Sequence, residues 1–156
     1  MAGVHRVCRS IIKWFSAVYV LAIVVQLFLA GAGVFRLYNV KHSDDCNKSG
    51  ASCVANSTSL DPHRALGIFL TEPGALLFLI IALLAWFPDT RIRTISIVAP
   101  ILTIIQEIFA WIGSWVGGLH VVNGILILGL YTWLAVKLFR QPQAAQASEP
   151  GPVTAT

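Results

Sequence analysis

Long apolar runs separated by short polar segments dominate the chain. Four of these runs approach or exceed the roughly 20 residues that an α-helix needs to cross the hydrocarbon core of a membrane. They cover residues 11–35, 65–87, 94–116 and 119–139. Because lipid offers no hydrogen-bond partner to an open backbone group, each run is expected to be helical. The pattern predicts an all-α integral membrane four-helix bundle over residues 11–139.

Composition supports the membrane assignment. Hydrophobic residues make up 56% of the chain and charged residues only 12%, whereas about 25% of an average soluble domain is charged. The net charge of +4 alone would also fit a nucleic-acid-binding protein. However, the basic residues flank the apolar runs instead of forming a stripe, which is typical of topology signals in membrane proteins. The distribution excludes nucleic acid as a partner and makes membrane lipid the expected surroundings.

The lysine and arginine residues predict the orientation of the bundle. They gather at three places that must share one side of the membrane: Arg6, Arg9 and Lys13; Arg91 and Arg93; Lys137 and Arg140. The positive-inside rule makes this side the cytoplasm of a plasma (inner) membrane. Residues 1–10 and a disordered tail, residues 140–156, are then cytoplasmic. A cleaved signal peptide is the less favoured alternative, because residues 11–35 are too long for its apolar region.

The opposite side of the membrane receives an outer loop, residues 36–64, and a tight turn at Gly117–Gly118. Cys46 and Cys53 both fall in the outer loop. Since the outer side is oxidising, we expect a disulfide between them, with two free thiols as the alternative.

A few polar side chains interrupt the apolar runs, where they are costly unless they serve a partner or a cavity. They are Gln26, Glu72, Gln106, Glu107, His120 and Asn123, with His63 just before the second run. Counting 1.5 Å per residue places the two glutamines and two glutamates in one layer, about 12–15 Å below the outer surface. The two histidines are expected in a shallower layer. Interhelical hydrogen bonds would explain the glutamines without a function, and a kink at Pro73 would explain Glu72.

One polar pattern occurs twice along the chain. Gln26 and Gln106 each begin the pattern Gln-x3-Ala-x2-Gly, and the next run after each copy opens with His-x3-Gly, at His63–Gly67 and His120–Gly124. The bundle is therefore predicted to consist of two pseudo-repeated hairpins, related by an axis along the membrane normal. Such an axis places His63 and His120 opposite each other across the bundle.

Two imidazoles that face each other across a helix bundle are suited to axial ligation of one haem iron. On this interpretation Gly67 and Gly124, one turn below the histidines, let a flat macrocycle approach the backbone. Arg64 is placed to pair with a haem propionate. Gln26 and Gln106 would orient the interior, and the intramembrane acids Glu72 and Glu107 would support the site or accept protons.

These motifs resemble one four-helix half of haem A synthase over about residues 10–140. That family carries Gln-and-Gly motifs on its first and third helices and a ligand His pair on its second and fourth. Asp61-Pro62-His63-Arg64 and Leu119-His120-Val121 match the ligand segments. The resemblance implies haem binding through His63 and His120. The family's Glu three places before the ligand is Leu60 here, and the second half is absent, so methyl hydroxylation is not implied. The chain is also similar to short uncharacterised four-helix bacterial membrane proteins.

Three functions remain open on the sequence. The leading hypothesis is a haem b-binding bundle for electron transfer or haem handling, with a redox or haem-pathway membrane partner or a second copy of the chain beside it. The second is a small transporter or channel subunit that uses Glu72 and Glu107. The third is a structural, partner-binding bundle. No nucleophile triad, phosphate-binding loop or CxxC motif is present, which favours a protein that is not an enzyme by itself.

Overall fold

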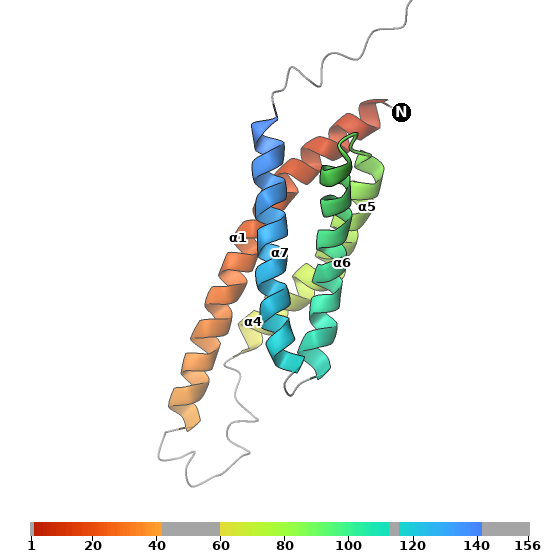
Figure 1. The fold of residues 1–156 in the computed structure, drawn as a ribbon. Coiled ribbons are helices and arrows are strands. Elements are labelled where there is room, and N and C mark those ends of the chain that lie inside the picture. Colours follow the sequence, from red (N-terminus) through yellow and green to blue (C-terminus); the bar gives the residue numbers. More distant parts are fainter. Residues whose placement is uncertain (1, 42–59, 113–115, 142–156) are drawn as a thin grey trace, which may run out of the picture.

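The computed structural model describes residues 2–41, 60–112 and 116–141, and its described elements are all helical (Figure 1). They are α1 (Ala2–Lys41), α4 (Asp61–Phe69), the π-helical turn η1 (Leu70–Gly74), α5 (Ala75–Ala85), α6 (Thr90–Ile112) and α7 (Val116–Arg140). Since α4, η1 and α5 run on as one segment, the described residues contain four helical segments long and apolar enough to cross a membrane. At most 39% of the apolar window of each segment is buried inside the bundle. The exposed apolar surface therefore faces lipid, and the chain is a multi-pass membrane protein.

The four segments form a closed ring in which α1 contacts α5, α5 contacts α6, α6 contacts α7, and α7 contacts α1. Successive segments run in opposite directions, so the start of α1 and the end of α7 lie at the same end of the bundle (Figure 1). We call this the terminal end, and the opposite end, where α4 and α7 begin, the histidine end. α1 projects beyond the start of α4 at the histidine end.

Side chains near the N-terminus fasten α1 to the last turn of α5 at the terminal end. The Arg9 guanidinium donates to the backbone oxygens of Ala85 and Trp86 at 3.0 and 2.9 Å, and His5 Nδ1 lies 2.8 Å from the Leu84 oxygen. These carbonyls have no partner within the helix, and basic groups are favourable at a helix C-terminus. The basic N-terminal segment thus has a structural role besides setting topology.

The short link between α5 and α6 supplies a cap for the end of one helix and for the start of the next. Trp86 follows α5 in the left-handed conformation, with a φ of 40°. Asp89 precedes α6, and its Oδ1 accepts hydrogen bonds from the backbone N–H groups of Arg91 and Ile92. A carboxylate in this position satisfies helix donors that would otherwise lack a partner.

The π-helical turn η1 forms around Pro73, which has no N–H to donate to the preceding turn. Tyr19 of α1 reaches into this turn, and its hydroxyl donates to the Leu70 oxygen at 2.9 Å. A Cβ on Gly74 would lie only 2.6 Å from the same hydroxyl. The missing side chain at Gly74 therefore allows α1 and the second span to approach closely at mid-bundle.

The core has an aromatic centre, in which Tyr19, Phe78 and Tyr131 are almost fully buried. The rings of Tyr19 and Tyr131 stack with centroids 4.6 Å apart. Beside them, Ile12 and Ser16 of α1 are fully buried, and so are Ile92 and Ser96 of α6. Both pairs have the same spacing, and each lies the same distance before the glutamine of its half. The repeat therefore extends from the histidine end to the terminal end.

The predicted all-α four-helix architecture is confirmed, with shifted helix ends. α1 continues to Lys41, six residues into the predicted outer loop, and α6 ends at Ile112 instead of residue 116. The tight turn predicted at Gly117–Gly118 is wrong, because α7 begins at Val116 and includes both glycines. The backbone hydrogen bonds of α7 outweigh the low helix propensity of these two glycines. Cys46, Cys53, most of the outer loop and the tail beyond residue 141 lie outside the described residues.

Candidate functional site

A cavity of about 500 Å³ lies inside the histidine end of the bundle and receives side chains from α1, α4, η1, α6 and α7. A volume of this size is typical of cofactor and ligand sites. All seven residues predicted to bind a cofactor line it: Gln26, His63, Arg64, Gly67, Gln106, His120 and Gly124. The structure thus brings residues from four separate stretches of sequence to one place.

Gln26 of α1 and His63 of α4 are joined by two reciprocal hydrogen bonds. Gln26 Nε2 donates to the His63 backbone oxygen at 2.7 Å, and His63 Nδ1 donates to the Gln26 backbone oxygen at 3.2 Å. Each side chain therefore satisfies a backbone carbonyl of the other helix. The pairing fixes the orientation of the imidazole ring.

Gln106 of α6 and His120 of α7 repeat this arrangement in the second half. Gln106 Nε2 donates to the His120 backbone oxygen at 2.7 Å, and His120 Nδ1 donates to the Gln106 backbone oxygen at 3.1 Å. These two distances match those of the first half within 0.1 Å. The repeat inferred from sequence is therefore present as one structural unit built twice.

The two imidazole rings face the same cavity from opposite halves of the bundle. Their centroids are 6.3 Å apart, and the ring planes meet at 73°, so the rings do not stack face to face. Because a carbonyl oxygen only accepts, each Nδ1 must carry the proton of its bond. In a neutral ring the lone pair then lies on Nε2. A histidine held in this way by a backbone carbonyl is the usual form of a metal-ligating histidine.

The two glycines have a packing role that the sequence does not show. A Cβ on Gly67 would lie 2.9 Å from Gln26 Nε2, and a Cβ on Gly124 would lie 3.2 Å from Gln106 Nε2. Each glycine thus provides the space in which the glutamine amide crosses to the histidine carbonyl. Both glycines also line the cavity, so their proposed second role, to let a macrocycle approach the backbone, stays a prediction.

The predicted separation into a deep glutamine layer and a shallow histidine layer is wrong. The hydrogen bonds place Gln26 beside His63 and Gln106 beside His120. The depth count failed because α1 runs past the start of α4, and because α6 ends four residues before the predicted boundary. Glutamines and histidines form a single polar layer.

The two halves differ at one position of this layer. Asn123 of α7 donates to Gln106 Oε1 at 2.6 Å and to the Leu102 backbone oxygen at 3.0 Å. The equivalent position in the first half holds Leu66, which has no polar group. Consistent with this difference, Gln26 Oε1 is buried without a hydrogen-bond partner among the described residues. The sequence shows Asn123 as an intramembrane polar residue but does not show its partner.

This asymmetry predicts unequal effects of the same substitution in the two halves. Gln26→Leu and Gln106→Leu each remove one interhelical hydrogen bond, from the Gln Nε2 to the His backbone oxygen, but only Gln106→Leu also deprives Asn123 of an acceptor. Interhelical hydrogen bonds in membranes contribute about 0.6 kcal/mol on average. We expect Gln106→Leu to lower the free energy of unfolding by about 0.5–1 kcal/mol more than Gln26→Leu. Denaturant titration in detergent would measure this difference, and equal losses of unfolding free energy would contradict the assigned role of Asn123.

The two intramembrane acids differ in exposure. Glu107 lines the cavity and accepts a hydrogen bond of 2.5 Å from Thr71 Oγ1. Glu72 follows Thr71 in the chain, but its side chain is exposed on the outer surface of the bundle and does not line the cavity. The predicted matching of depth holds, since Thr71, which precedes Glu72 in the chain, contacts Glu107. The role of Thr71 was not visible in the sequence.

Within the described parts of the chain, no cluster of three or more His, Cys, Asp or Glu side chains could hold a bare metal ion. The site therefore offers a histidine pair and one carboxylate around a mostly apolar cavity. Arg64 borders the cavity and is otherwise exposed, so it places a positive charge at the mouth.

No protein-family model, curated protein or solved structure matches this chain. The resemblance to one half of haem A synthase thus stays a prediction from the motifs.

Proposed function

We propose that this small membrane protein binds one haem b between His63 and His120 and acts in electron transfer or haem handling. The observation that carries the proposal is the pair of imidazoles at 6.3 Å, each anchored through Nδ1 to a backbone carbonyl of the neighbouring helix. Interfacial packing alone does not require two histidines to be oriented in the same way over one cavity.

The ring separation fits two nitrogen ligands on one metal ion. A metal–imidazole bond is about 2 Å long, and the nitrogen lies about 1 Å from its ring centre, so two axial rings are about 6 Å apart. The observed 6.3 Å agrees with this sum. Since each Nδ1 is engaged with a carbonyl, Nε2 is the ligating atom in both halves.

The other cavity residues also suit a porphyrin. Apolar side chains such as Ile23, Leu27 and Ile127 form much of the wall and exclude water. Arg64 at the mouth is positioned to pair with a propionate. Bound haem supplies reversible one-electron transfer between ferric and ferrous iron. Gln26 and Gln106 hold the ligand rings in place, and the Glu107 carboxyl group lines the same cavity.

The membrane orientation belongs to the same proposal. Seven lysine and arginine residues lie toward the terminal end, which the positive-inside rule assigns to the cytoplasm. The haem site then lies toward the outer side of a plasma (inner) membrane, and so does the proposed Cys46–Cys53 disulfide. An electron donor or acceptor would approach from that side, in a membrane partner or a second copy of the chain.

Haem titration of the purified full-length protein in mild detergent tests this function. The expected result is a low-spin absorption spectrum that saturates at one haem per chain and sharpens on reduction. A protein that gives only the spectrum of free haem in detergent, at every ratio, would overturn the proposal.

A further inference from the structure

A second hollow lies on the outer face of α7, away from the haem cavity. It has a volume of about 680 Å³ and is lined along α7 from Ile125 to Arg140. Tyr131 and Leu134 of the same helix are buried in the core, whereas Gly129 and Thr132 of the hollow are exposed. The hollow therefore opens to the surroundings of the bundle, which are lipid.

The shape of this groove comes from two residues one helical turn apart. A Cβ on Gly129 would meet no atom within 4 Å, so the floor of the groove is open there. Trp133 is partly buried, packs against the core and forms a wall. The groove from Ile125 to Lys137 is about 18 Å long at 1.5 Å per residue. One leaflet of the hydrocarbon core is about 15 Å thick, so the groove matches a single acyl chain in length.

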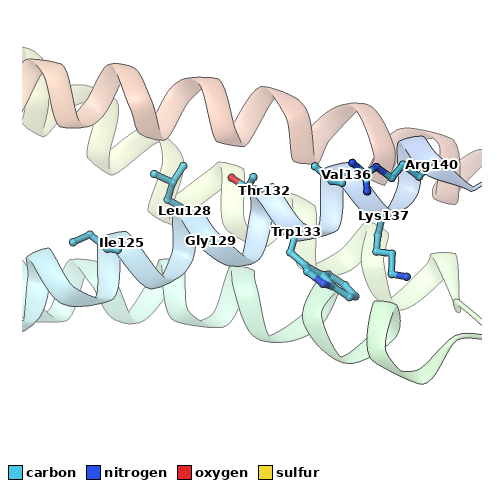
Figure 2. A pocket seen from close by; sticks show the side chains of 8 residues that line it. All are labelled: Ile125, Leu128, Gly129, Thr132, Trp133, Val136, Lys137 and Arg140. Carbon is cyan, nitrogen blue, oxygen red and sulfur yellow. The ribbon is translucent and has the colours of Figure 1, made fainter.

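The groove ends at two positive charges, Lys137 and Arg140, at the terminal end of α7 (Figure 2). Both side chains are exposed, and neither forms an ion pair with a described residue. Other cations at this end are engaged: Lys13 lies over the Phe139 ring and Arg93 over the Trp86 ring. The groove thus combines an apolar channel of leaflet length with a pair of available cations at its headgroup end.

We propose that this groove binds an anionic phospholipid, with an acyl chain along Gly129 and the phosphate on Lys137 and Arg140. A second copy of the chain is a poorer occupant. Two copies inserted in the same orientation would meet through the same face. That contact would bring four cations together at one end, which is unfavourable without an intervening anion. A basic pocket beside a membrane helix recognises anionic headgroups for the same electrostatic reason.

Lipid binding can be measured by native mass spectrometry and thermal unfolding of the full-length protein with added phosphatidylglycerol or phosphatidylcholine. We expect phosphatidylglycerol to be retained and to raise the unfolding midpoint, while phosphatidylcholine does neither. Lys137→Gln/Arg140→Gln should weaken phosphatidylglycerol binding roughly 10- to 30-fold. Gly129→Leu, which keeps both charges and fills the floor, should also weaken it. Arg91→Gln is the matched control, because it removes an exposed cation of the terminal end outside the groove.

Three outcomes with the lipids and variants would overturn the proposal. The first is equal effects of the two lipids, and the second is a loss in Arg91→Gln as large as that in the double variant. The third is a dimer that disappears in Gly129→Leu, which would assign the groove to a second copy. Inorganic phosphate is a further probe: if it reproduces the full shift of the midpoint, the site binds a free anion and not a lipid.

Discussion

Replacing His63 with alanine is expected to abolish the low-spin haem spectrum, and replacing His120 is expected to do the same. Each substitution removes one of two ligands and leaves the iron five-coordinate at best. Loss of groups that merely orient a ligand weakens metal binding by about 10- to 100-fold. Loss of a ligand should therefore weaken haem binding by at least about tenfold. The double variant should bind no haem specifically.

His5→Ala is the matched control for these variants. His5 also places Nδ1 near a backbone oxygen, that of Leu84, but at the terminal end. Its loss should leave the haem spectrum unchanged. Because His63 and His120 also hold Gln26 and Gln106, each alanine variant is checked for folding by circular dichroism. Added imidazole should restore six-coordination in a folded variant. A spectrum that survives in either single variant would show that the two histidines are not a ligand pair.

The equivalence of the two histidines was predictable because it depends only on which residue types recur along the chain. Glutamine, histidine and glycine recur at fixed offsets, and glutamine and histidine are rare or costly in lipid. The hydrophobic pattern likewise sufficed for four spans, since length and polarity decide whether a helix crosses a membrane. The helix ends were less predictable. α1 continues through residues 36–41, and the polar residues in this stretch resemble those of the outer loop that follows.

The hydrogen-bond partners of the site residues depend on contacts between helices, and a single sequence does not show these contacts. A glycine near a histidine fits either a cofactor or a neighbouring side chain. The approach of Gln26 Nε2 to Gly67 shows the neighbouring side chain, and the cofactor role stays a prediction. Similarly, Glu72 and Glu107 share a depth, but Glu72 is exposed, while its neighbour Thr71 bonds Glu107 at the cavity.

Gly74→Ala is expected to be among the most destabilising single-methyl substitutions in the bundle. The added Cβ would lie 2.6 Å from the Tyr19 hydroxyl and 3.0 Å from the Phe69 backbone oxygen. Neither atom can move freely, because Tyr19 is 1% exposed and Phe69 belongs to the helix backbone. Overpacking of this kind costs about 1–3 kcal/mol. The displaced hydroxyl would also lose its hydrogen bond to Leu70, which contributes about another 0.5–1 kcal/mol.

A double-mutant cycle with Tyr19→Phe isolates the cause. Tyr19→Phe alone should cost about 0.5–1.5 kcal/mol, because the Leu70 oxygen keeps its bond from the Ala75 N–H. Combined with Gly74→Ala, it removes the hydroxyl that the new methyl group meets. The double variant should therefore be more stable than the sum of the single losses by about 1 kcal/mol or more. Gly31→Ala, where a Cβ meets no atom within 4 Å, is the control and should not lower stability. Additive losses would mean that the methyl group strains the π-helical backbone itself instead of the contact between α1 and η1.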